Sequence, residues 1–262
     1  MAGSTAEVSH KEHQLLAGLY RAEIAGACVD IGLDYQYTRY EYRDLPSRNR
    51  DLHRLVFPIR FRYEHDGLQF QGHLSPGIST SSNVLKDLFD RAGSDDIQIN
   101  GRFQARKKSG DRDVFGGVAY DHSFGQPKLY PVAGLEFQAT DRLHIRLAYP
   151  DPGARYESTE SQALTARLFP SGSEWHVVTD DFADEFDYRV EALRAQFTWS
   201  LRLDSRFSPD LSAGYEFDRR HVFTDDLGTR IRAEVEDQWL FGVGLRFGPS
   251  PLLYTHGAHI GS

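Results

Sequence analysis

Residues 239–247 read WLFGVGLRF. The odd-numbered positions, from Trp239 to Phe247, are all apolar, whereas small residues, Leu240 and Arg246 lie between them. Successive side chains of a β-strand point to opposite faces, so this stretch predicts a strand with one apolar face. The fold class depends on whether that face meets a protein core or a lipid bilayer.

The same period-2 alternation recurs along the chain from residue 27 onward, interrupted by turn residues. It predicts about twelve strands, an even number as expected for single-chain bacterial outer-membrane barrels. The segments are 27–38, 54–64, 68–78, 97–107, 114–122, 129–138, 143–149, 162–169, 174–179, 188–203, 211–219 and 231–247. The count is approximate because 174–179 alternates poorly and Pro58, Pro76 and Pro131 fall inside strand runs.

Composition excludes several classes of protein. The chain has 262 residues, 40% of them hydrophobic and 26% charged, and its mean hydropathy is −0.52. No apolar stretch approaches the ~18 residues of a transmembrane helix, and a net charge of −8 argues against a nucleic-acid binder. One cysteine, Cys28, excludes an intramolecular disulfide framework and a cysteine-based zinc site.

Connection and strand lengths favour the bilayer. Short connections near 65–67, 108–113, 139–142, 170–173 and 204–210 alternate with longer polar ones near 39–51, 79–96, 150–161, 180–187 and 220–229. Short turns at one rim and long loops at the other are typical of outer-membrane barrels. Runs such as 188–203 exceed the ~5–6 residues of ordinary strands.

The polar face of these strands is rich in arginine, accompanied by carboxylates. An enclosed lumen with cross-strand Arg–carboxylate pairs explains this preference over lysine better than a solvated exterior does. The predicted lumen-lining residues are Asp30, Asp34, Arg54, Arg60, Arg62, Arg102, Glu136, Arg146, Arg194, Arg202, Glu216 and Arg246. The predicted lipid-facing residues are Trp199, Trp239, Phe241, Val243, Leu245 and Phe247.

Two stretches carry a family resemblance. The ending DQWLFGVGLRF looks like the terminal assembly signal of bacterial outer-membrane proteins. Together with YPVAGLEFQATDRLHIRLAYPDPGARYE, it resembles a family of small, uncharacterised outer-membrane β-barrel proteins. The resemblance implies a location and an architecture but no reaction. One departure is that fifteen residues follow Phe247, where such chains usually stop.

We therefore expect an all-β protein, a transmembrane antiparallel up-and-down β-barrel of about twelve strands over 27–247. Residues 1–26 are expected to be irregular or to hold a short helix at 8–22, and 248–262 to be an irregular tail. A second short helix is expected at 84–92. Residues 1–13 contain no apolar core of a signal peptide, so either the protein is not exported or an added leader has replaced the export signal; Met-Ala-Gly-Ser favours the second.

Candidate chemistry is sparse. His122 and Ser123 invite comparison with outer-membrane lipid hydrolases, but adjacent strand residues point to opposite faces and do not easily share a proton. The paired histidines His10/His13 and His256/His259 lie in the terminal segments, and the acidic pairs Asp95-Asp96 and Asp180-Asp181 lie in expected outer loops, where they could take Ca²⁺ or lipopolysaccharide through it. Tail composition and solvation explain them better. We predict no catalytic residue, metal or cofactor.

The predicted function is passive: a narrow channel for small acidic solutes, or a closed structural or scaffolding barrel. Arginine rings in a pore select anions, whereas arginines paired with the interspersed acids would close the lumen. The alternatives are an outer-membrane lipid-modifying hydrolase and a soluble all-β binding protein. Expected partners are outer-membrane lipid, lipopolysaccharide and, during biogenesis, the barrel-assembly machinery, but not nucleic acid. The oligomeric state is left open.

Overall fold

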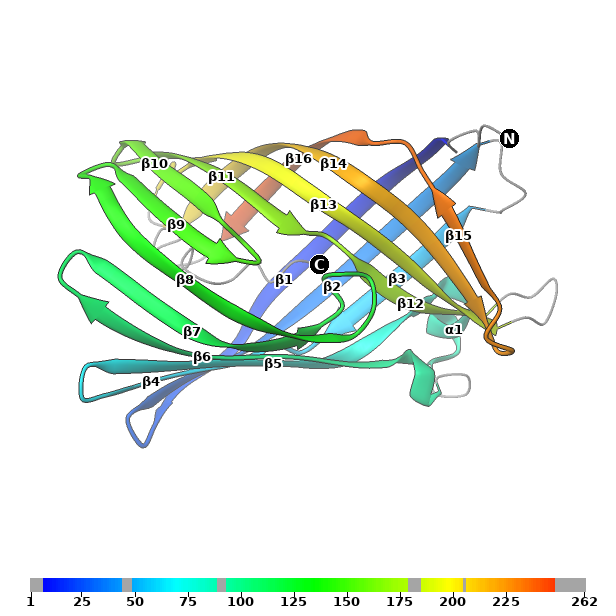
Figure 1. The fold of residues 1–262 in the computed structure, drawn as a ribbon, viewed down its shortest axis with the longest axis horizontal. Coiled ribbons are helices and arrows are strands. Elements are labelled where there is room, and N and C mark those ends of the chain that lie inside the picture. Colours follow the sequence, from blue (N-terminus) through cyan, green and yellow to red (C-terminus); the bar gives the residue numbers. More distant parts are fainter. Residues whose placement is uncertain (1–6, 44–48, 89–92, 179–184, 205, 248–262) are drawn as a thin grey trace.

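The computed structural model describes residues 7–43, 49–88, 93–178, 185–204 and 206–247. These residues form one sixteen-stranded sheet that curls into a barrel (Figure 1). Its strands are β1 (Glu7–Ile24), β2 (Ala27–Arg43), β3 (Arg50–Val56), β4 (Ile59–His65), β5 (Leu68–Ser81), β6 (Ile97–Ser109), β7 (Arg112–Asp121), β8 (Lys128–Thr140), β9 (Leu143–Tyr149), β10 (Gly153–Thr159), β11 (Gln162–Pro170), β12 (Ser173–Val178), β13 (Glu185–Leu201), β14 (Phe207–Asp225), β15 (Arg230–Glu234) and β16 (Gln238–Phe247).

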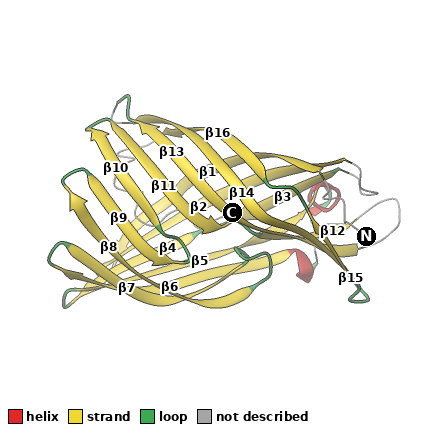
Figure 2. Cartoon of the chain, turned by 45° about the horizontal axis from the view of Figure 1, so that its top comes forward, coloured by secondary structure: helices red, strands yellow, loops and turns green. Residues whose placement is uncertain are grey.

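The two ends of the barrel differ. The end with the short β1–β2, β4–β5, β6–β7, β8–β9 and β10–β11 connections is called the turn end, and the opposite one the loop end. The loop end carries the start of β1, together with β12 and the short helix α1 (Ser82–Lys86) (Figures 1 and 2). A 3₁₀ turn, η1 (Ser94–Asp96), precedes β6.

The sheet closes in an unexpected way. β12 pairs antiparallel with β13 and also meets β5 in parallel, through His176 and Thr80. This contact closes a mixed ring of nine strands, β5 to β13, and leaves β1–β4 and β14–β16 outside it. The expectation of an all-β barrel is confirmed, whereas a simple up-and-down barrel of about twelve strands is wrong.

Sixteen strands arise instead of twelve because the expected strands 54–64 and 231–247 are each split in two, into β3 and β4 and into β15 and β16, and because β1 and β10 were not expected. β3 and β4 both pair with β2 and β5, on either side of Pro58, whose carbonyl accepts a hydrogen bond from the N–H of Gly32 at 2.9 Å. The expected turn at 170–173 is likewise a break within one line of strand, because β11 and β12 both pair with β13. The expected long connection at 150–161 contains β10.

The expected helix at 8–22 is also wrong, since β1 occupies this segment and pairs with β2 along nearly its whole length. The hairpin turns at Ala25 and Gly26, which both have positive φ, as a tight two-residue turn requires. Pairing with β2 overrides the local helical pattern. The second expected helix, 84–92, is realised only as α1, and residues 89–92 lie outside the described chain. So does the predicted tail at 248–262.

An apolar core fills the loop end between β12–β14 and β1–β3. Its buried members are Val8, Tyr40, Leu52, Trp175, Val177, Tyr188, Val190 and Val235. The Tyr42 hydroxyl donates to the Tyr188 hydroxyl at 2.6 Å, and the Tyr188 hydroxyl lies 2.7 Å from Nδ1 of His221. Each fully buried large side chain contributes about 1.5–3 kcal/mol, so this cluster fixes the loop end.

The two outer edges of the sheet meet at this core. Within the described chain, β1 pairs only with β2, and β15 and β16 pair only with β14. Side chains join the edges instead: the Arg219 guanidinium donates to the carbonyl of Val8 at 3.4 Å, and Gln238 lies 2.5 Å from the ring of His10.

Candidate functional site

The faces of β16 are the clearest guide to inside and outside. Its burial alternates at every residue, with Trp239, Phe241, Val243, Leu245 and Phe247 exposed. Phe241 is 81% exposed and Phe247 77%. Trp199 is half-buried on the same face of β13 as the exposed Phe197. The predicted lipid-facing side chains therefore lie on the outer surface of the barrel.

Most of the predicted lumen-lining residues lie enclosed on the opposite, inner face of their strands, but two of them do not. Arg62 is on the inner face but is exposed near the turn end. Arg202 follows the end of β13, and its guanidinium donates to the carbonyl of Glu160. The other ten, buried or half-buried in the strands, are Asp30, Asp34, Arg54, Arg60, Arg102, Glu136, Arg146, Arg194, Glu216 and Arg246. Asp218 of β14, two residues after Glu216, is exposed and has a positive φ.

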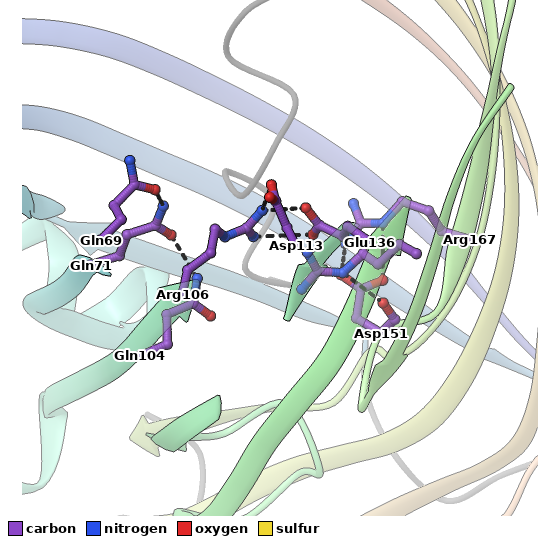
Figure 3. A network of polar contacts seen from close by, with 9 residues as sticks. Gln69, Gln71, Gln104, Arg106, Asp113, Glu136, Asp151 and Arg167 are labelled. Atoms are coloured by element: carbon purple, nitrogen blue, oxygen red, sulfur yellow. Dashed lines mark hydrogen bonds and ion pairs between the residues drawn. The ribbon is translucent and has the colours of Figure 1, made fainter. Parts of the chain in front are cut away.

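Glu136 on β8 is the centre of a network of polar contacts on this inner face (Figure 3). It accepts from the guanidinium groups of Arg106 and Arg146, and Arg106 also lies 3.3 Å from Asp113. Side-chain exposure is only 9% for Arg106 and 13% for Glu136. Buried charges must be paired, and here one carboxylate serves two arginines, Arg146 from the neighbouring β9 and Arg106 from β6, which lies beyond β7.

Further polar groups extend this network in both directions (Figure 3). On one side, the Arg167 guanidinium donates to Asp151 at 2.6 and 3.1 Å, a two-point contact. On the other side, Gln104 donates to Gln71 at 2.6 Å, and Gln71 donates to Gln69. The interior therefore presents amides beside ion pairs.

A second network surrounds Glu216 on β14, which is 2% exposed. Its Oε1 accepts from Arg194 at 2.7 Å and from the Ser171 hydroxyl at 3.0 Å, and its Oε2 lies 3.5 Å from Arg219. Arg194 also lies 3.9 Å from Glu12 of β1. These contacts link the segment between β11 and β12 with β13, β14 and β1, whereas in the described residues the edge strands β1 and β16 share no backbone pairing.

The β7–β8 connection, residues 122–127, lies against β12 and β13 at the loop end, and we call it the cap turn. The N–H of Gly172 donates to the carbonyl of Ser123 at 2.6 Å. Gly125 has a φ of +90°, and an added Cβ there would lie 2.5 Å from the Glu191 side chain. Only glycine suits this close approach. The cap turn therefore covers the interior of the nine-strand ring at the loop end.

His122 begins the cap turn and contacts two polar groups. Its Nδ1 lies 2.8 Å from Oδ1 of Asn100, and its Nε2 lies 3.4 Å from Glu174. Burial lowers the pKa of His122 to about 4, with Arg54 and Arg189 adding to the decrease and Asp121 opposing it. The imidazole is thus neutral at pH 7, and its contact with Glu174 is not a salt bridge there.

The other chemical candidates are not brought together. Ser123 donates its backbone N–H to Asp121 at 2.9 Å, away from the His122 contacts. His10 lies on the inner face of β1, whereas His13 stacks on Tyr37 on the outer face. Asp96 caps the N–H of Gly93 at 2.9 Å rather than facing a ligand with Asp95. Asp180, Asp181, His256 and His259 lie outside the described residues.

In the described ranges, no three His, Cys, Asp or Glu side chains gather in a way that would hold a metal ion. Sequence reasoning missed His73 and the glutamines of β5 and β6, which share the inner face. The signal that could have revealed them is the alternation of 68–78, in which the odd positions are polar. It also missed the aromatic core, because Trp175 lies in the poorest strand pattern.

No helix of the described chain is both long and apolar enough to cross a membrane. Neither a protein-family model nor a curated protein matches the chain.

Proposed function

We propose that this protein is a bacterial outer-membrane β-barrel that acts as a closed structural barrel. The observation that carries the proposal is the distribution of side chains between its two faces. Large apolar side chains are exposed on the outer face of strands throughout the barrel, among them Leu15, Phe61, Leu74, Phe103, Val118, Leu147, Leu168, Phe197, Leu211 and Phe241. Soluble proteins rarely expose contiguous apolar surface of this extent.

The dimensions of β16 support a membrane location. The segment in which every second side chain is apolar and exposed covers nine residues, 239–247. This length falls within the ~9–11 residues of a tilted spanning strand. Eight steps of ~3.3 Å give about 26 Å along the strand, or about 20 Å along the membrane normal at a tilt of ~40°. This is close to the ~25 Å apolar band of outer-membrane barrels.

Burial at the loop end supports a closed barrel. The interior there is occupied by the apolar core, by the cap turn, and by contacts across to β12. The Ser79 hydroxyl donates to the carbonyl of Glu174 at 2.6 Å, and Gln98 donates to the same carbonyl at 2.8 Å. Ser79 is fully buried, whereas Arg62 and Glu64 near the turn end are exposed. A solute path would therefore be open at the turn end and blocked at the loop end.

A restricted channel for acidic solutes is the second candidate. One observation favours it: Arg60 and Arg102 face the interior without an ion pair to any described residue. An unpaired arginine in a lumen attracts anions. A hydrolase finds less support, because His122 and Ser123 have separate partners.

Vesicle insertion and conductance test these proposals. The purified chain should float with phospholipid vesicles and change its gel mobility on heating, whereas a detergent-free monodisperse monomer would refute the membrane location. In planar bilayers the wild type should be silent. Gly172→Ala should raise conductance, because the new Cβ would lie 2.2 Å from the backbone nitrogen of Gly125 and displace the cap turn. Steady anion conductance by the wild type would favour the channel instead.

A further inference from the structure

The arginines of the inner face fall into two groups. Most are neutralised by carboxylates, as in the Glu136 and Glu216 networks, which include Arg106 of β6 and Arg194 of β13, and Arg246 of β16 lies 2.5 Å from Asp210. On the β4–β6 side, Arg60 and Arg102 make no hydrogen bond or ion pair with any part of the chain that the structure describes. This unpaired group is the feature that the proposed function leaves unexplained.

The two arginines flank one histidine in a single cross-strand row. Arg60 of β4 is the register partner of His73 of β5, and His73 is the register partner of Arg102 of β6. Directly opposed residues share a face and have Cβ atoms about 5 Å apart. Their neighbours Phe61 and Phe103 are exposed on the outer face, with ring centroids 6.3 Å apart. The row therefore points inward.

Carboxylates lie near the row, Asp30 and Asp34 on the Arg60 side and Asp121 and Asp151 on the Arg102 side, but none of them forms an ion pair with either arginine in the described chain. Asp30, which faces Arg60 from β2, is engaged by Arg21. His73 uses Nε2 for the Ser75 hydroxyl, at 2.8 Å, and its buried Nδ1 has no partner among the described residues. The Nε of Arg102 is likewise buried without a hydrogen-bond partner there.

The next row toward the turn end is made of amides. Gln71 and Gln104 lie side by side there, joined by their 2.6 Å hydrogen bond, and Arg62 is the register partner of Gln71. Arg62 is exposed, whereas Arg60, His73 and Arg102 are half-buried. A solute that enters from the turn end would meet the amides and then the two arginines.

We propose that Arg60 and Arg102, with His73 between them, form a binding site for the oxyanion of a small solute, either a carboxylate or a phosphate. Two guanidinium groups present planar sets of N–H donors that match such oxygens. A bound anion would also neutralise charges that are otherwise partly buried and unpaired. Gln71 and Gln104 would bind the hydroxyl or amide groups of the same solute. This site extends the proposed function, because it gives the closed interior a ligand. It rests on the proposed function in one respect only, namely that the solute enters from the turn end.

The test is calorimetric titration of the full chain in detergent at pH 7.5, at fixed low ionic strength. The probes are inorganic phosphate, acetate and, as an uncharged control, glucose. We expect phosphate or acetate to bind and glucose not to bind, and the probe that binds more tightly identifies the oxyanion. Binding should weaken as sodium chloride is added.

The variants Arg60→Gln and Arg102→Gln should each weaken binding about ten- to a hundredfold, because a hydrogen bond to a charged group is worth ~1.5–3 kcal/mol. Arg102→Lys should give an intermediate loss. The matched control is Arg246→Gln, which removes an inner-face arginine that Asp210 already pairs. Heat-dependent gel mobility shows that each variant is folded.

Absence of phosphate and acetate binding by the folded wild type would overturn the site, and so would equal losses in Arg102→Gln and Arg246→Gln. Vesicle flotation of the same samples separates this result from the membrane proposal. Anion binding without flotation would support the site and refute the membrane location. Flotation without anion binding would support the membrane location and refute the site.

Discussion

Val243→Arg tests the membrane location at the point where the two environments differ most. Val243 is the middle residue of the nine-residue apolar run of β16, and its side chain is 77% exposed on the outer face. No neighbouring side chain covers this position to any great extent, so the substitution introduces a charge without creating a cavity. The change in the free energy of unfolding therefore shows whether lipid or water surrounds this side chain.

The expected magnitude follows from the depth of the residue. Arginine at the midplane of an outer-membrane barrel costs about 2–4 kcal/mol, and the cost falls to about 0–1 kcal/mol near the interfaces. On a soluble protein, a substitution at so exposed a site stays within about 0.5 kcal/mol. The two environments thus differ by more than the error of an unfolding measurement.

The assay is equilibrium urea unfolding in phospholipid vesicles, followed by tryptophan fluorescence. The matched control is Leu227→Arg, because Leu227 is 92% exposed in the β14–β15 connection at the loop end, outside the apolar run. We expect Val243→Arg to lower the free energy of unfolding by about 2–4 kcal/mol and Leu227→Arg by about 0–1 kcal/mol. Equal effects of the two substitutions would refute a bilayer around β16.

Three further predictions concern the interior and the loop end. Trp175→Ala should lower the free energy of unfolding by about 3–5 kcal/mol, because Trp175 is 2% exposed in the apolar core; urea unfolding measures this. Glu136→Gln should cost about 3–5 kcal/mol in the same assay, since it leaves Arg106 and Arg146 without their shared carboxylate. His122→Gln should make the melting temperature less dependent on pH between about 4 and 6.5. In this window His122 of the unfolded chain binds a proton, whereas His122 of the folded chain, with a pKa of about 4, does not. The free energy of unfolding of the wild type therefore decreases by up to about 3 kcal/mol as the pH falls.

Each of these predictions has its own contrary outcome. A loss for Trp175→Ala no larger than that for the exposed Leu227→Ala would mean that the loop-end core is not formed. If Glu136→Gln costs no more than Glu64→Gln, whose side chain is exposed near the turn end, the Glu136 network does not stabilise the barrel. Parallel melting curves for His122→Gln and the wild type across the pH range would show that the ring is not buried.

Alternation alone determined the all-β class and the division into an apolar and a polar face. Those features depend on side-chain direction along a strand, which is a local property with period 2. In the structure, the odd-numbered residues of 239–247 are exposed along β16, and Arg54, Arg60 and Arg194 lie on the inner face of their strands.

Only the tertiary structure decided how the barrel closes and which charges pair. Whether residues 170–173 turn or continue depends on β13, which binds both β11 and β12, and no local pattern reports this. β1 is a strand because β2 offers it partners along its length. The pairing of charges is also decided by neighbouring strands. Arg60 and Arg146 lie in similar sequence patterns, but Arg146 has the carboxylate of Glu136 beside it. The cross-strand neighbours of Arg60 on the β5 side are His73 and then Arg102. Pairing is a contact between strands, so it is set by register and not by composition.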